Sequence, residues 1–590
     1  ATPHLNGKDA SVTFETCISG KADRVVVTVE GVGETELFLT EVQGLCDAAS
    51  VTQMGNGSIE IPNVHRWNGR KDPYLYTATA TLYKNGQAVD QVTTRFGCRE
   101  YRFDPEQGFF LNGESYPLHG VSRHQDRAGV GNALTKEMHE EDLNLILSMG
   151  ANSIRLAHYQ HDQYFYDLCD EKGLIVWAEI PYITVHMPNG RENTIQQMKE
   201  LIVQNYNHAS IICWAISNEV SLQGVTEDLL ENHRILNDLI HKMDPSRVSA
   251  MANLFLLETD SPLVTLPDIR GYNLYYGWYV GEMEDNDAWF DEFHAKYPET
   301  VIGLTEYGAD SVITLQSPRP EKGDFTEGSQ ALYHEHMLEM FSKRPYLWGT
   351  YCWNMFEFGA AGRDEAGDPG KNHKGLITFD RKQKKDAFYI YKAWWSDEPF
   401  VHLCGRRYHD RLEPVTEIKV YTNQKQITLL VDGVEVETKT GEHIFRFAVP
   451  ISGMHEIQAV VPGTSLTDTM EIEKVSEPNP TYFASKDKVR NWFDEETETS
   501  EETSGFFSIH DTMGEIQQTP EGAAILGQMM AQMKSQMAGG MGENAEIPQA
   551  MLAMIARQPL VKLLQQAGID PKGETAQQLN AALSRIPKNR

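Results

Sequence analysis

The segment Ile211-Ile212-Cys213-Trp214-Ala215-Ile216-Ser217-Asn218-Glu219 is an apolar run that ends in an amide and a carboxylate. Its length suits one β-strand, and its lack of alternation between apolar and polar residues is typical of a strand buried on both faces. A second run, Val301-Ile302-Gly303-Leu304-Thr305, leads in the same way into Glu306. Strands of this kind that alternate with amphipathic helices predict a parallel sheet covered by helices.

This alternation of apolar strand segments with amphipathic helical segments extends from about residue 102 to residue 395. One helical pattern covers residues 135–149, where Met138, Leu143, Ile146 and Leu147 recur at helical spacing. Strand–helix units repeated over this length predict a (β/α)8 barrel, or TIM barrel, over residues 101–398. The candidate strands are residues 116–122, 151–157, 174–180, 210–217, 247–254, 268–275, 301–308 and 347–355.

The flanking segments read as β-sandwiches. Residues 1–100 contain alternating, β-branched runs, separated by turns such as Asn85-Gly86. Residues 405–476 turn all-β again, and Val431-Asp432-Gly433-Val434 is a hairpin signal. The sequence therefore predicts a multidomain protein in which immunoglobulin-like β-sandwiches flank a TIM barrel.

The last part of the chain differs in composition from the rest. Residues 477–507 form an acidic linker rich in Ser and Thr, and residues 508–590 form a helical, Met-rich C-terminal tail. A second helix of this tail is expected over about residues 548–567. The helically spaced residues Met529, Met530, Met533 and Met537 predict a core or a self-docking face, with a partner-binding helix as the alternative.

Composition excludes several classes of partner. Lys and Arg number 52 and Asp and Glu number 84, so the net charge is −32. An acidic surface of this size argues against nucleic acids and anionic membranes as partners. No apolar run reaches the length that a transmembrane helix needs. The seven cysteines are scattered and form no CxxC pair, which favours a reducing compartment such as the cytoplasm.

The chemistry is expected where the strands end. Active sites of TIM barrels lie at the carboxyl ends of the strands, so Glu219 after the fourth strand and Glu306 on the seventh share one rim. Paired carboxylates in such a place are what glycoside hydrolysis needs, one as acid and the other as nucleophile or base. The acid needs a raised pKa, which a neighbouring carboxylate and apolar walls such as Trp214 can provide.

Several ordered motifs give the sequence a family resemblance. It resembles glycoside hydrolase family 2, and within it the bacterial β-galactosidases, over about residues 10–475. The motifs are His119-Gly120-Val121-Ser122-Arg123-His124-Gln125-Asp126-Arg127, Ile154-Arg155-Leu156-Ala157-His158-Tyr159-Gln160, Trp177-Ala178-Glu179-Ile180-Pro181, Trp214-Ala215-Ile216-Ser217-Asn218-Glu219, Thr305-Glu306-Tyr307-Gly308, Tyr351-Cys352-Trp353-Asn354-Met355-Phe356 and Asn372-His373-Lys374-Gly375-Leu376.

The resemblance implies a retaining mechanism, with Glu219 as general acid/base and Glu306 as the nucleophile. It implies that Asn218 binds the sugar 2-hydroxyl and that Trp353 forms an apolar platform under the sugar. The family tyrosine beside the nucleophile aligns with Tyr275, although Tyr272 and Tyr276 compete for that position. The remaining substrate contacts implied are His124, His158, Asn372 and Lys374.

The chain also departs from the family pattern. Family members carry a jelly-roll domain ahead of the first sandwich, and this chain begins after it. Some family β-galactosidases bind Mg2+ through the acid/base Glu and a Glu–x–His pair after the third strand. Only Glu179 and His186 are present there, at a different spacing. We therefore expect no required cofactor or metal.

Sugar identity rests on two sets of residues. Asn372-x-Lys374 resembles the carboxylate-reading motif of the family's β-glucuronidases, but Asp368 stands where those enzymes have an Arg. The His-Gln-Asp-Arg and Ala-His-Tyr-Gln strings favour a galactosidase. The expected function is a retaining exo-β-galactosidase with accompanying transgalactosylation. A β-glucuronidase or β-hexuronidase is the alternative, as is a non-catalytic sugar-binding protein on the same fold. We expect a small carbohydrate substrate, a homo-oligomer and a bacterial cytoplasmic location.

Overall fold

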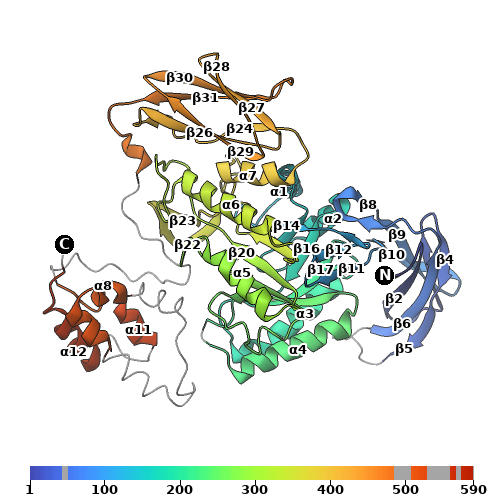
Figure 1. Cartoon of the computed structure of the whole chain (residues 1–590). Coiled ribbons are helices and arrows are strands. Elements are labelled where there is room, and N and C mark those ends of the chain that lie inside the picture. Colours follow the sequence, from blue (N-terminus) through green and yellow to red (C-terminus); the bar gives the residue numbers. More distant parts are fainter. Residues whose placement is uncertain (43–50, 223, 484–505, 528–558, 567–572, 589–590) are drawn as a thin grey trace. The chain divides into compact units, whose positions relative to one another are not determined.

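The computed structural model describes residues 1–42, 51–222, 224–483, 506–527, 559–566 and 573–588 (Figure 1). The chain divides into two compact units. The first comprises residues 1–275 and 286–487, and the second comprises residues 276–285 and 488–590. Among the described residues, no helix has both the length and the apolar character needed to cross a membrane.

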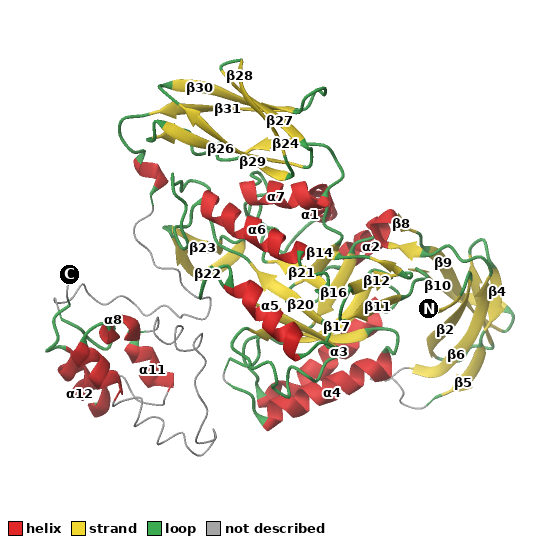
Figure 2. Ribbon diagram, in the orientation of Figure 1, coloured by secondary structure: helices red, strands yellow, loops and turns green. Residues whose placement is uncertain are grey.

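A closed parallel barrel of eight strands lies at the centre of the first unit (Figure 2). Every barrel strand predicted from the sequence is present; β17 has the predicted length, and the others are shorter than the segments that predict them. Neighbouring strands are in parallel register throughout, as between Gly120 of the first strand and Ser153 of the second. The strands are β14 (Leu118–Arg123), β15 (Ser153–Leu156), β16 (Ile175–Glu179), β17 (Ile211–Asn218), β18 (Val248–Leu254), β19 (Ile269–Asn273), β20 (Ile302–Tyr307) and β21 (Gly349–Cys352).

Helices connect the strands. The first begins where its sequence predicts, because the Thr135 side chain accepts a hydrogen bond from the backbone N–H of Met138 and caps the helix. It ends at Gly150, whose φ of +94° suits glycine and where a Cβ atom would lie only 2.5 Å from the backbone of Trp395. The helices are α1 (Lys136–Met149), α2 (Gln163–Lys172), α3 (Arg191–Asn205), α4 (Glu227–Met243), α5 (Asp285–Lys296), α6 (Glu327–Ser342) and α7 (Asp386–Trp395).

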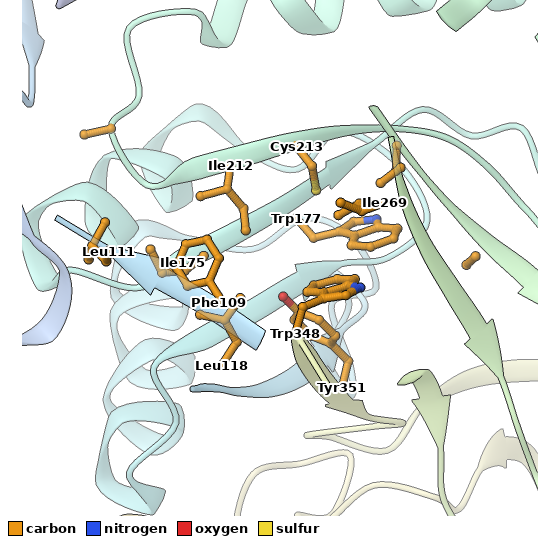
Figure 3. Close-up of a cluster of buried hydrophobic side chains, with 14 of the residues drawn as sticks. Phe109, Leu111, Leu118, Ile175, Trp177, Ile212, Cys213, Ile269, Trp348 and Tyr351 are labelled. Atoms are coloured by element: carbon orange, nitrogen blue, oxygen red, sulfur yellow. The ribbon is translucent and has the colours of Figure 1, made fainter. Parts of the chain in front are cut away.

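A buried, largely aromatic cluster fills one end of the barrel (Figure 3). Trp177 and Trp348 stack with ring centroids 5.6 Å apart, and Phe109 of β12 packs against the same cluster. The cluster includes Leu118 and Ile175, the first residues of β14 and β16, so it occupies the amino-terminal end. Side chains with reactive groups are thereby left to the opposite end. Three strands not foreseen from the sequence form the sheet that contributes Phe109: β11 (Tyr101–Asp104), β12 (Gly108–Leu111) and β13 (Glu114–Ser115).

The first sandwich has two four-stranded antiparallel sheets, of strand order β1-β2-β6-β5 and β10-β9-β3-β4. Alternate residues of β2 such as Ala10, Val12 and Phe14 are buried, which is the period-2 pattern of a strand with one face in a core. Its strands are β1 (Thr2–Asn6), β2 (Asp9–Ser19), β3 (Arg24–Val29), β4 (Gly33–Glu36), β5 (Phe38–Glu41), β6 (Val51–Ile61), β9 (Tyr76–Lys84) and β10 (Gln87–Phe96), with the short pair β7 (Trp67–Asn68) and β8 (Asp72–Pro73) beside them.

The second sandwich packs a three-stranded sheet, β24-β26-β29, against a five-stranded one, β25-β31-β30-β27-β28. The predicted hairpin is confirmed, since β27 and β28 are joined through Asp432 and Gly433, both with positive φ. The strands are β24 (Val401–Leu403), β25 (Asp410–Arg411), β26 (Val415–Thr422), β27 (Gln426–Val431), β28 (Val434–Thr440), β29 (His443–Pro450), β30 (Met454–Val460) and β31 (Thr467–Lys474).

The described residues of the C-terminal tail form helices around their own apolar cluster, which includes Ile516, Leu560 and Leu583. The helices are α8 (Met513–Gln517), α11 (Leu560–Gln566) and α12 (Glu574–Leu583). Most of the acidic linker, the four spaced methionines and most of the helix expected over residues 548–567 lie outside the described residues. The domain boundaries expected from the sequence stay a prediction.

Candidate active site

Glu219 and Glu306 lie at the carboxyl-terminal end of the barrel. Glu219 directly follows β17, and Glu306 is the penultimate residue of β20. Each is only 4% exposed. Glu219 has a φ of +53°, a conformation that residues other than glycine rarely adopt. Its backbone N–H donates to the carbonyl of Ala252 on β18 at 3.0 Å. Strained backbone of this kind clusters at functional sites, because the surrounding structure must hold it in place.

Arg155 and Asn273 join the two carboxylates into one hydrogen-bond network. The Arg155 guanidinium donates to Glu306 Oε1 at 2.6 Å and to Asn218 Oδ1 at 2.8 Å. The Asn273 amide donates to Glu219 Oε1 at 2.9 Å and to Asn218 Oδ1 at 3.1 Å. Since the oxygen of Asn218 is occupied by these two donors, its amide nitrogen is the group able to donate to a sugar hydroxyl.

The two carboxyl groups have different surroundings. Both oxygens of Glu306 accept hydrogen bonds, one from Arg155 and the other from the Tyr275 hydroxyl at 2.8 Å. Glu219 has the neutral Asn273 amide as its hydrogen-bond donor. Burial, together with the nearby negative charge of Glu306, raises the pKa of Glu219 to about 8. The site therefore holds one carboxylic acid protonated at neutral pH beside a carboxylate that a guanidinium stabilises.

Two histidines and a tryptophan form an aromatic wall beside the carboxylates. The ring of His158 stacks on Trp353 with centroids 4.9 Å apart, and His124 meets Trp353 edge-on at 5.2 Å. Phe358, which the sequence analysis did not single out, lies 4.3 Å from His124 between ring centroids. Burial, followed by the nearby charge of His158, lowers the pKa of His124 well below its usual value. His124 is thus a neutral hydrogen-bonding group at physiological pH.

The two residues considered as Mg2+ ligands bind different partners. Glu179 is buried against Arg155 at 3.3 Å and the His158 Nδ1 atom at 3.1 Å. Burial raises the Glu179 pKa, but the Arg155 charge and the hydrogen bonds from His158 and Trp177 together outweigh burial, so the pKa is lowered overall. His186 instead pairs through Nε2 with Asp228 at 2.6 Å. The structure thus does not bring Glu179 and His186 together as a ligand set.

The Asn372–Lys374 segment reaches the same end of the barrel. It begins at the last residue of an unforeseen hairpin, which consists of strands β22 (Phe358–Glu365) and β23 (Asp368–Asn372). The Lys374 ammonium is buried in an ion pair with Asp310 and lies 5.8 Å from the ring centroid of Tyr275. Because the Tyr275 hydroxyl binds Glu306, one aromatic ring separates this lysine from the candidate nucleophile. Asn372 Oδ1 accepts from the backbone N–H of Lys374 at 3.0 Å.

The structure thus gathers the predicted site residues Glu219, Glu306, Asn218, His124, His158, Tyr275, Trp353, Asn372 and Lys374 at one end of the barrel. Of the competing tyrosines, Tyr275 donates a hydrogen bond to Glu306, whereas Tyr272 donates to the carbonyl of Leu257 at 3.1 Å. Three further residues were missed as site residues: Arg155, Asn273 and Asp310. Arg155 carried a usable signal, because it is a cation within the apolar strand segment Ile154-Arg155-Leu156.

Two family models match the chain. The model described as "Glycosyl hydrolases family 2, TIM barrel domain" matches residues 105–397, and "Glycosyl hydrolases family 2" matches residues 1–99. A curated β-glucuronidase of Bacteroides fragilis is 37% identical over 497 residues, which cover 80% of this chain and 70% of the relative. Other curated relatives are covered less fully, with 52% of a putative β-glucuronidase of Formosa agariphila and 62% of the Streptococcus agalactiae β-glucuronidase.

Solved structures also match this chain over most of its length. An FMN-binding β-glucuronidase from Faecalibacterium prausnitzii L2-6 is 40% identical, with a TM-score of 0.77 over 82% of this chain and 74% of that one. A putative β-galactosidase from Bacteroides fragilis is 35% identical, with a TM-score of 0.73 over 80% of this chain and 72% of that one.

These comparisons correct the expected substrate. Curated relatives from Bacteroides fragilis, Streptococcus agalactiae and human are named β-glucuronidases, and the F. prausnitzii structure carries the same name. The β-galactosidase expectation is therefore wrong, and its stated alternative is the better supported one. The predicted family and the predicted TIM barrel with β-sandwiches are confirmed by the family models and the strand topology. The chain belongs to glycoside hydrolase family 2.

Proposed function

We propose that this protein is a retaining exo-β-glucuronidase, which hydrolyses terminal β-D-glucuronides. The observation that carries the proposal is the buried ammonium of Lys374 beside Tyr275, whose hydroxyl binds Glu306. A cation held next to the nucleophile suits a sugar whose C6 is a carboxylate, because charge-assisted hydrogen bonds to carboxylates are strong and directional. The names of the relatives support the same substrate class.

The mechanism follows from the unequal surroundings of the two carboxyl groups. Glu306 attacks the anomeric carbon while the Glu219 proton passes to the leaving oxygen, so an alcohol departs and a glucuronosyl ester of Glu306 forms. Water then attacks the same carbon, giving its proton to the Glu219 carboxylate, and the Glu306 carboxylate is released. Asn218 donates to the 2-hydroxyl, and this contact strengthens as the oxocarbenium-like transition state develops.

Substrate identity is read at two places. The aromatic wall of His124, His158 and Trp353 offers hydrogen-bonding groups and an apolar face, which serve glucosides, galactosides and uronides alike. Lys374 and Asn372 offer the groups that discriminate a carboxylate from a hydroxymethyl group. Asp368, which replaces the arginine of other β-glucuronidases, pairs with Lys371 at 2.7 Å and takes no part in the contacts of Lys374 described above.

A direct comparison of two substrates tests the proposal. We expect p-nitrophenyl β-D-glucuronide to be cleaved with a kcat/KM at least about 100-fold above that for p-nitrophenyl β-D-galactoside, because a site built for a charged partner rejects an analogue that lacks it. Chromogenic assays of the purified chain give both values. A preference for the galactoside would overturn the assignment. Absence of turnover and of covalent labelling by a glucuronate-configured aziridine would favour the non-catalytic sugar-binding alternative.

Removing the charge of Lys374 has a specific expected cost. Lys374→Gln alone would leave the Asp310 carboxylate buried without its cation, so the informative variant is the double change Lys374→Gln/Asp310→Asn. We expect a 10- to 100-fold loss of kcat/KM for the glucuronide, roughly the 1.5–3 kcal/mol of a hydrogen bond to a charged group. Activity on the galactoside should change far less. Equal losses on both substrates would show that Lys374 does not read the carboxylate.

The raised pKa of Glu219 predicts the alkaline side of the pH profile. Because the acid must hold its proton, kcat/KM for a phenyl glucuronide falls as pH rises through about 8, tenfold per pH unit above it. The measurement is kcat/KM from pH 5 to pH 10, with aliquots returned from pH 9.5 to pH 7 to control for inactivation. A reversible fall centred near pH 5 would contradict the assignment of Glu219 as a buried acid.

The expected homo-oligomer and cytoplasmic location stay predictions. So does the role of the Met-rich tail. Sedimentation of the purified full chain tests the first of these.

A further inference from the structure

The residues that read the substrate carboxylate are held by a second, fully buried ion pair. Lys385, immediately before α7, is 0% exposed, and its ammonium lies 2.8 Å from Glu357 Oε1. The same ammonium donates to the carbonyl of Ser311 at 2.7 Å and to the carbonyl of His373 at 2.9 Å. An ammonium has three N–H donors, so these three acceptors use all of them and fix its orientation.

Glu357, immediately before β22, completes this connection. Its Oε1 atom also meets His373 Nδ1 at 3.3 Å, and its Oε2 atom accepts from the backbone N–H of Phe379 at 3.2 Å. Burial on its own raises the Glu357 pKa, but the positive charge of Lys385 and the contacts with His373 together outweigh burial and lower the pKa to about 2. The carboxylate therefore keeps its negative charge across the pH range in which a glycosidase works.

His373 links this pair to the substrate-reading residues. It stands between Asn372 and Lys374 in the chain, and its backbone N–H donates to Asp310 Oδ1 at 3.0 Å. Asp310 is also the ion-pair partner of Lys374. The backbone of His373 is thus held at its carbonyl by Lys385 and at its N–H by Asp310. These contacts therefore determine where the side chains of the neighbouring Asn372 and Lys374 lie.

We infer that Lys385 and Glu357 are positioning residues that set the place of the carboxylate-reading segment Asn372–Lys374. Neither side chain belongs to the network around Glu219 and Glu306, so their effect reaches the substrate through the backbone of His373. Selectivity for a uronic acid then depends on an ion pair that the sugar never touches. This inference rests on the proposed β-glucuronidase function.

The test compares two inhibitors of matched shape. One is an iminosugar that carries a carboxylate in the glucuronate configuration, and the other is its neutral hydroxymethyl analogue. The variant is Lys385→Met/Glu357→Gln, which removes both buried charges together. We expect Ki for the charged inhibitor and KM for the glucuronide to rise about tenfold or more, because small displacements of binding groups have large effects. We expect kcat and Ki for the neutral inhibitor to change less than about threefold.

Control variants separate positioning from general loss of structure. Lys392→Met removes an α7 lysine whose partner, Glu398, is mostly exposed, and should leave both Ki values unchanged. If the double variant does not fold, Glu357→Gln, which keeps the side-chain shape, should show the same selective loss at about threefold. Equal weakening of both inhibitors, or no weakening of either, would overturn the inference. Failure of the wild-type chain to cleave glucuronides would instead overturn the proposed function.

Discussion

Glu306→Gln is expected to lower kcat/KM for p-nitrophenyl β-D-glucuronide by at least about 10⁴-fold, the scale seen when a catalytic nucleophile is removed. The amide cannot form the ester intermediate, so binding alone remains. Gln keeps the shape of the side chain, so its contacts with Arg155 and Tyr275 are altered in charge rather than in volume. The loss should therefore appear in kcat, with KM changed little.

Two measurements accompany this variant. The wild-type protein should gain the mass of a glucuronate-configured aziridine in a stoichiometric reaction, and Glu306→Gln should gain none. Glu299→Gln, an exposed position on the loop before the same strand, is the matched control and should behave as wild type. Residual labelling at Glu306→Gln, or full turnover, would mean that another carboxylate is the nucleophile.

Glu219→Ala is expected to have the second largest effect, which depends on the leaving group. General acid catalysis typically contributes 10²–10⁴-fold, so hydrolysis of phenyl glucuronide should fall by about 10⁴-fold and that of the activated p-nitrophenyl glucuronide by about 100-fold. With the activated substrate the ester intermediate still forms, and its hydrolysis becomes slow because no base activates water. A small anion that needs no base should then restore turnover.

Azide supplies that test. We expect azide to raise kcat of Glu219→Ala on the activated substrate and to yield a β-glucuronosyl azide, whose retained configuration reports attack on the Glu306 ester. Glu258→Ala, an exposed glutamate on the loop after β18, should show neither the loss nor the rescue. If azide had no effect, or gave the α-product, the acid/base assignment of Glu219 would be wrong.

The sequence predicted the barrel well because several strands, such as β17, are contiguous apolar runs, and burial on both faces leaves such a run few alternatives. It also placed Glu219 and Glu306 on one rim, since parallel strands end together. It did not foresee β11–β13 or the β22–β23 hairpin. These strands are short or mixed in polarity, and only contacts distant in sequence, such as that of Phe103 in β11 with Trp348, determine their positions.

The substrate was predicted wrongly for a related reason. The galactosidase expectation rested on strings near His124 and His158, which line a wall that different sugars share. The discriminating arrangement joins Lys374, Asp310 and Tyr275, which come from three separate segments. No local spacing reveals that a lysine will sit beside a particular tyrosine. Arg155 and Asn273 were overlooked because a polar residue within a strand does not show, by itself, which side chain it will meet.

The charge of Glu306 has a consequence for the timing of the reaction. It is one of the two causes that raise the pKa of Glu219, burial being the larger. Once Glu306 is esterified that charge is gone, so the pKa of Glu219 drops at the moment when it must accept a proton from water. Release of the sugar restores the negative charge of Glu306. This raises the pKa of Glu219 again, so Glu219 holds its proton for the next cycle. The charge state of Glu306 thus sets the pKa of Glu219 at each stage. Each chemical step therefore prepares the protonation state of Glu219 that the following step requires.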